Sequence, residues 1–137
     1  MLLAPYLTAA ATGDMVNALV VLFALLVGHA LGDFPLQGDF LAVFKNPGVD
    51  TTGDNIPPEV RGLTIWPYCL TAHALIHGGI VGLILGSPLL ALIEFFLHWI
   101  IDLGKGLGMT NFHADQSLHI VCKIGYIAAI LLGWVKY

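Results

Sequence analysis

The stretch LTIWPYCLTAHALIHGGIVGLILGSPLLALI, residues 63–93, contains no formally charged side chain. A transmembrane helix needs about 20 mostly apolar residues, so this stretch is too long for a single crossing. Gly86-Ser87-Pro88 divides it, because glycine and proline both interrupt helices. The sequence therefore predicts two helices, at about residues 67–85 and 88–103, joined by a tight turn.

Two further apolar segments flank this pair. One is predicted at residues 15–33, with Asp14 placed to cap its start and Pro35 near its end. The other is predicted at residues 113–135. One long connection, residues 34–66, separates the first two helices, and its early part mixes apolar and polar residues in a way that indicates a short helix at a membrane interface.

The composition supports a membrane protein. Of the 137 residues, 58% are hydrophobic and only 10% are charged, with a mean hydropathy of +0.87. A water-soluble domain carries about 25% charged residues, which this small chain lacks. We therefore expect a single all-α domain, residues 1–137, that forms an integral membrane four-helix bundle in the lipid bilayer. The net charge of −4 and the absence of a basic run argue against nucleic acid as a partner.

Ionisable side chains recur four residues apart in every predicted helix. Residues at this spacing lie on one face of a helix, one turn apart. The sets are His29 with Asp33, His73 with His77, Glu94 with His98 and Asp102, and Asp115 with His119 and Lys123. Ionisable residues inside a membrane are costly enough to indicate a functional site.

The four sets are expected to meet on one side of the membrane. They lie near the C-terminal ends of the first and third helices and in the N-terminal halves of the second and fourth. Because successive helices alternate in direction, these positions fall at the same depth, and a rise of about 6 Å per four residues predicts three layers. From the surface inward the layers are Asp33, His73, Asp102 and Asp115, then His29, His77, His98 and His119, then Glu94 and Lys123.

The two outer layers predict a metal site. Imidazole suits zinc, iron, copper and nickel, and added carboxylates suit a pair of metals in the core of a helical bundle. The predicted ligands of one or two divalent ions (zinc, iron or manganese) are His29, Asp33, His73, His77, His98, Asp102, Asp115 and His119. Any single pair is more often a hydrogen bond between helices, but four converging pairs favour a site that binds metal or handles protons.

Other polar residues have supporting roles in this interpretation. Glu94 and Lys123 are expected to form a buried structural ion pair. Gln37, Asp39 and Gln116 are candidates to orient the ligands through hydrogen bonds.

The loop charges predict an orientation in the membrane. Lys45, Arg61 and Lys105 lie in connections on the side of the polar residues, whereas the other side carries Lys136 and the N-terminal amine. The positive-inside rule therefore places the polar cluster towards the cytoplasm and both termini outside.

Residues 28–39, GHALGDFPLQGD, resemble the opening motif of a domain-of-unknown-function family of small inner-membrane proteins from bacteria and their phages. That motif reads His, small, Leu, small, Asp, Phe, any residue, Leu, Gln, any residue, Asp. The similarity extends over about residues 24–125 and includes the later pairs His73/His77, His98/Asp102 and Asp115/His119. The family has no established activity, so the resemblance implies a multi-pass protein of the bacterial inner membrane and no particular reaction. A looser likeness to inner-membrane proteins described as metal-dependent hydrolases favours hydrolysis.

The leading hypothesis is a metal-dependent hydrolase acting on a lipid head group or small phosphoester. The metal would activate water, and Asp33 or Asp115, nearest the aqueous side, would be the general base. Three alternatives stay open: a transporter of divalent metal or protons, a haem protein, and a structural or interaction protein of phage or bacterial origin. A homo-oligomer is also left open.

Overall fold

A computed structural model describes residues 3–135, which form six helices and no strand. The helices are α1 (Ala4–Ala11), α2 (Met15–Asp33), α3 (Gly38–Phe44), α4 (Trp66–Leu85), α5 (Pro88–Gly106) and α6 (Phe112–Leu131). The predicted all-α class is therefore confirmed over the described part of the chain.

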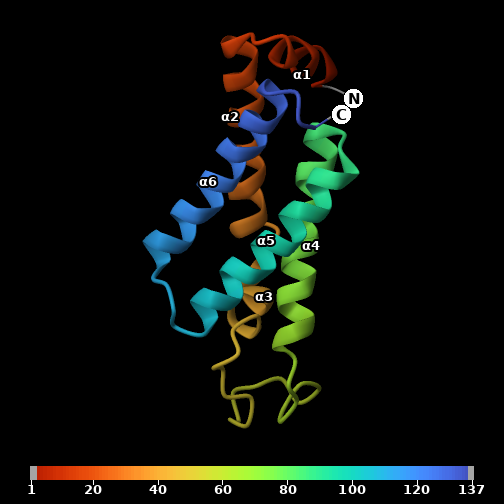
Figure 1. Ribbon diagram of the computed structural model, residues 1–137. Helices are drawn as coiled ribbons and strands as arrows, with labels where there is room; N and C mark the ends of the chain where they lie inside the picture. The colour runs from red at the N-terminus through yellow and green to blue at the C-terminus, as the bar shows by residue number, and fades with distance from the viewer. Residues whose placement is uncertain (1–2, 136–137) are drawn as a thin grey trace.

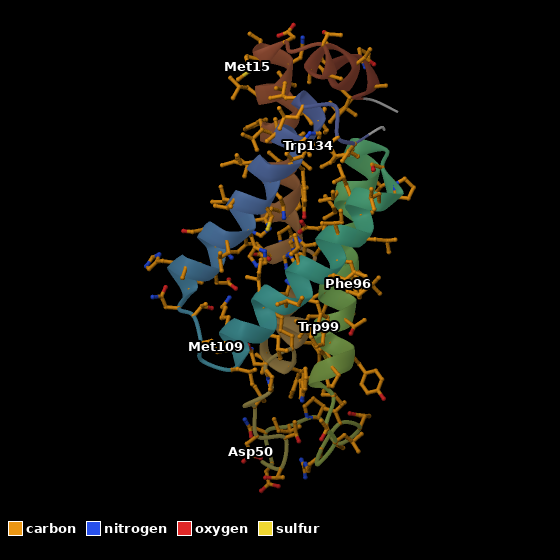
Figure 2. The ribbon with its side chains drawn as sticks, viewed as in Figure 1. Met15, Asp50, Phe96, Trp99, Met109 and Trp134 are labelled. Carbon is orange, nitrogen blue, oxygen red and sulfur yellow. The ribbon has the colours of Figure 1, made fainter. Side chains whose placement is uncertain are left out.

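The four long helices pack as a ring in which α4 contacts α2 and α5, and α6 contacts the same two helices. Successive helices of this ring run in opposite directions (Figure 1). The short α1 packs against α2 and α6 at one end, and α3 with the long connection lies at the other. Met15 and Trp134 lie near the first end and Asp50 lies at the second (Figure 2).

Local sequence signals fix four ends of the long helices. The side chains of Asp14, Ser87 and Asn111 accept backbone N–H bonds in the first turns of α2, α5 and α6. Gly86 ends α4 in the left-handed conformation, with φ of 66°, and the chain then turns into Pro88 at the start of α5.

The structure differs from the predicted boundaries at three places. The sequence predicts no helix before residue 15, but α1 forms there because its alanine-rich segment with Pro5 in the first turn favours a helix. Helix α5 continues to Gly106 instead of ending near residue 103, and α6 ends at Leu131 instead of near residue 135.

Buried charged side chains and exposed large apolar side chains occur together in this fold. Glu94 and Lys123 are each 1% exposed, whereas Phe23 and Phe96 on the outer faces of α2 and α5 are 67% and 59% exposed. Helices α2 and α4 are long and apolar enough to cross a membrane, with mean hydropathies of 2.1 and 1.6. Two of the four predicted spans therefore meet the length and composition requirement for crossing a membrane. The other two, α5 and α6, carry most of the buried charges.

Apolar and polar residues fill different halves of the ring. The half next to α1 is an apolar core that includes Leu7, Leu25, Leu85, Leu90 and Ile130. A smaller apolar cluster of Phe44, Ile56 and Cys69 lies under the long connection. The buried histidines and carboxylates occupy the helix segments between these two apolar clusters.

Candidate metal centre

The structure brings all eight residues predicted as metal ligands into one cluster formed by α2, α4, α5 and α6. Five of the six histidines of the chain belong to it, and the sixth, His113, is exposed. Asp33 alone among the eight is partly exposed, with 12% of its side-chain surface accessible. The alternating helix directions thus gather the four polar sets as the sequence pattern requires.

Three overlapping groups within the cluster could each hold a metal ion, because one ligand atom per residue lies within 4.8 Å of every other in its group. The groups are Asp33, His73, His77 and His98; His29, His98 and His119; and Asp102, Asp115 and His119. His98 is shared by the first and second groups, and His119 by the second and third. At most two of these groups could therefore be occupied at the same time.

The Asp33 group contains short contacts between candidate ligand atoms. Asp33 Oδ1 lies 3.2 Å from His77 Nε2 and 3.4 Å from His73 Nε2. The buried His77 Nε2 nevertheless has no hydrogen-bond partner among the described residues, since its contact with Asp33 lacks hydrogen-bond geometry. A buried polar atom left unpaired costs about 1–3 kcal/mol. A cation between His77 and Asp33 would remove this cost, so the donor set fits a metal ion.

Glu94 sets the orientation of His98. Glu94 Oε1 lies 3.2 Å from His98 Nδ1 and accepts a hydrogen bond from Lys123 Nζ at 2.6 Å, while Tyr126 donates to Glu94 Oε2 at 2.8 Å. When His98 Nδ1–H donates to Glu94, the lone pair of His98 Nε2 is directed into the cluster, where His73 Nε2 lies 3.1 Å away. Carboxylate–histidine pairs of this kind orient the ligands of metal sites. Glu94 and Lys123 are thus in contact as an ion pair, and Tyr126 is a further partner that the sequence pattern does not indicate.

Two lysines in predicted loops also reach the cluster. Lys45 Nζ, directly after α3, lies 2.6 Å from Asp102 Oδ2, and Lys105 Nζ lies 3.0 Å from Asp115 Oδ2. Sequence reasoning misses both pairs, because they join residues on different elements; Lys45 and Asp102 are 57 positions apart. These ammonium groups already neutralise Asp102 and Asp115, so Asp33 is the ligand-type aspartate without a lysine partner in the described chain.

Gln37, Asp39 and Gln116, the three residues expected to orient ligands, make different contacts in the structure. Gln116 Nε2 donates to Asp33 Oδ2 at 2.8 Å, and its Oε1 lies 3.3 Å from His29 Nε2. Gln37 Nε2 donates to the backbone carbonyl of Asp33 at 2.9 Å, so it holds the chain and not the carboxylate. Asp39 is exposed in the first turn of α3 and makes no side-chain hydrogen bond within residues 3–135.

A cavity of about 220 Å³ gives access to the cluster at Asp33. It is lined by residues of α2, α5 and α6 and of the α3 segment, including Asp33, Gln37, Lys45, Lys105 and Gln116. A small molecule in this cavity would contact a candidate metal ligand directly.

No family model, curated protein or solved structure matches the chain. The interpretation of the cluster therefore depends on its own geometry, and the resemblance of residues 28–39 to a family stays a prediction.

Proposed function

We propose that the protein is an integral membrane hydrolase whose active site holds one divalent transition metal ion, bound by Asp33, His73, His77 and His98. The observation that carries this proposal is the convergence of four ligand atoms within 4.8 Å of one another, one of which, His77 Nε2, is buried without a hydrogen bond. Three imidazoles and one carboxylate suit zinc, iron or manganese.

The combination of buried charges and exposed apolar side chains supports the membrane location. Buried charged residues and large exposed apolar residues are both expensive for a protein in water, whereas lipid makes the exposed apolar faces favourable. We place all four long helices across the bilayer, in a bacterial inner membrane, with the metal centre on the cytoplasmic side. The polar residues of α5 and α6 then face the interior of the bundle.

The chemistry follows from the ligands and from the cavity. A bound divalent ion would make water a stronger acid and polarise a phosphoryl oxygen. Asp115 is the candidate general base, because its buried Oδ1 has no hydrogen-bond partner within residues 3–135 and lies 3.7 Å from His119 Nε2. Asp33, the other candidate base, serves as a ligand in this arrangement. The substrate is a lipid head group or small phosphoester that enters through the 220 Å³ cavity.

Two alternatives have less support. A transporter needs a polar path to both faces, but beyond Glu94 and Lys123 the ring is filled by the apolar core around Leu25 and Leu85. Haem needs a gap between axial histidines, but the His98 ring stacks on His77 at 3.7 Å and on His119 at 4.1 Å.

Metal content is the direct test. Protein purified in detergent without chelator is expected to contain about one equivalent of zinc, iron or manganese by mass spectrometry, and His77→Ala is expected to contain less than a tenth of that. His113→Ala is the matched control, since it removes the exposed histidine outside the cluster. Hydrolysis of phosphodiesters should be lost with chelator and in His77→Ala.

Two results would contradict the proposal. A wild-type protein that neither contains metal nor takes it up would show that the histidines form only internal hydrogen bonds. Metal retained at the wild-type level in His77→Ala would place the ion in another group of ligands. Metal retained without any hydrolysis would support a binding or transport role.

A further inference from the structure

The cavity beside Asp33 carries two ammonium groups. Lys45 and Lys105 both line it, with side chains 10% and 30% exposed. An ammonium group has three N–H donors, and each lysine has one carboxylate partner, Asp102 or Asp115. Each group therefore retains donors for a molecule in the cavity.

The charges of the buried cluster favour an anion once a metal is present. The four carboxylates of Asp33, Glu94, Asp102 and Asp115 face the three ammonium groups of Lys45, Lys105 and Lys123. With all five imidazoles neutral, this leaves one net negative charge, and a divalent ion changes it to one net positive charge. Uncompensated charge in a low-dielectric interior is costly, so a singly charged anion would complete the balance.

The two ammonium groups reach the cavity from different elements. Lys45 follows α3, and Lys105 lies on α5. A tetrahedral phosphoryl group presents oxygens in several directions and suits such donors better than a planar carboxylate does. The buried Gln37 Oε1, which also belongs to the cavity lining, has no hydrogen-bond partner in the described chain and can accept from a hydroxyl of the same ligand.

We propose that this cavity is the binding site of a singly charged phosphodiester group, held by Lys45 and Lys105, and that the phosphodiester binds more tightly when the metal ion is present. The inference rests on the proposed metal centre and specifies its substrate class. A phospholipid head group and a free phosphodiester share this chemistry. Linkage requires the phosphodiester to strengthen metal binding by the same factor.

The test measures binding and not hydrolysis. Metal-loaded and metal-free proteins, in nonionic detergent after removal of free metal, are dialysed against radiolabelled dimethyl phosphate, which carries one negative charge. Neutral trimethyl phosphate is the control ligand. We expect binding to metal-loaded protein at least tenfold tighter than to metal-free protein, and no binding of trimethyl phosphate.

Variants assign the contacts. Lys105→Met and Lys45→Met are each expected to weaken dimethyl phosphate binding at least tenfold, with metal content kept at the wild-type level as the check of folding. Lys45→Arg keeps the charge and should retain binding if Lys45→Met does not fold. Arg61→Gln is the control, since it removes an exposed cation at the same end of the molecule.

Competition identifies the source of the phosphodiester. Displacement of dimethyl phosphate by micellar phosphatidylglycerol, but not by zwitterionic phosphatidylcholine, supports a lipid head group, whereas displacement by neither supports a small soluble phosphodiester. Metal-loaded protein that does not bind dimethyl phosphate, or lysine variants that bind it normally, would overturn this inference and leave the metal centre standing. Failure to bind metal at all would instead overturn the proposed function.

Discussion

At the scale of single residues, Gly32 determines how closely His77 approaches α2. A Cβ atom on Gly32 would lie 2.5 Å from His77 Nε2, which is too close for any real contact. Gly32→Ala is therefore expected to displace the imidazole and weaken metal binding at least tenfold, measured by competition with a chromogenic chelator.

Gly79→Ala is the matched control for Gly32→Ala. A Cβ atom on Gly79 meets no other atom within 4 Å, so this substitution should leave metal affinity unchanged and stabilise α4 by up to about 1 kcal/mol. Normal metal binding by Gly32→Ala would contradict the assignment of His77 as a ligand.

The ion pair of Glu94 and Lys123 gives a second prediction at this scale. Lys123→Met leaves the Glu94 carboxylate, 1% exposed, without its cation, and such a loss typically costs about 3–5 kcal/mol. The double variant Glu94→Gln, Lys123→Met removes both charges and should recover most of this loss. Unfolding by SDS in mixed micelles measures the free energies, and equal destabilisation of the single and double variants would show that the pairing is unimportant.

At the scale of elements, the cap of α2 gives a prediction about pH. The backbone N–H of Asn17, together with its side-chain amide, donates to Asp14 and lowers the pKa of this carboxyl group. A lowered pKa in the folded state means that the carboxylate contributes stability above its unfolded pKa of about 3.9, and that this contribution is lost as the pH falls through the folded value.

The comparison of Asp14→Asn with wild type isolates this effect, because asparagine caps a helix without titrating. From pH 7 down to about 3, the unfolding midpoint of the wild type should fall more than that of Asp14→Asn. Parallel curves for the two proteins would mean that the cap contributes nothing to the stability of α2.

Some features of the helices can be predicted from the sequence, and others cannot. Helix positions follow from local signals such as the cap at Asp14 and the Gly86-Ser87-Pro88 turn, so α4 and α5 begin within a residue of their predicted starts. The polar sets can be predicted from their four-residue spacing, because residues on one face of a helix pack against the same neighbouring helices. Lys45 with Asp102 and Tyr126 with Glu94 depend instead on how helices pack, which no local pattern reports.

At the scale of the whole molecule, the orientation in the membrane depends on charges that the folded structure partly buries. Lys45 and Lys105 are paired within the cluster, and of the three cations expected at this end Arg61, beside Asp54, is the most exposed. Loop charges act on the chain during insertion, before these pairs form, so all three still count for the positive-inside rule. We therefore keep the prediction that the metal centre faces the cytoplasm.

Labelling of single cysteines tests this orientation together with the crossing by α2. Thr12 is exposed just before α2, and Asp54 is exposed in the connection that follows α3. Thr12→Cys and Asp54→Cys are therefore introduced separately after Cys69 and Cys122 are changed to alanine. In intact cells an impermeant maleimide should label position 12 and not position 54, and permeabilisation should expose both. The reverse pattern would place the metal centre outside, where its substrate would come from the outer leaflet. Labelling of both positions in intact cells would contradict a crossing by α2, and with it the interpretation of the exposed apolar faces as lipid contacts.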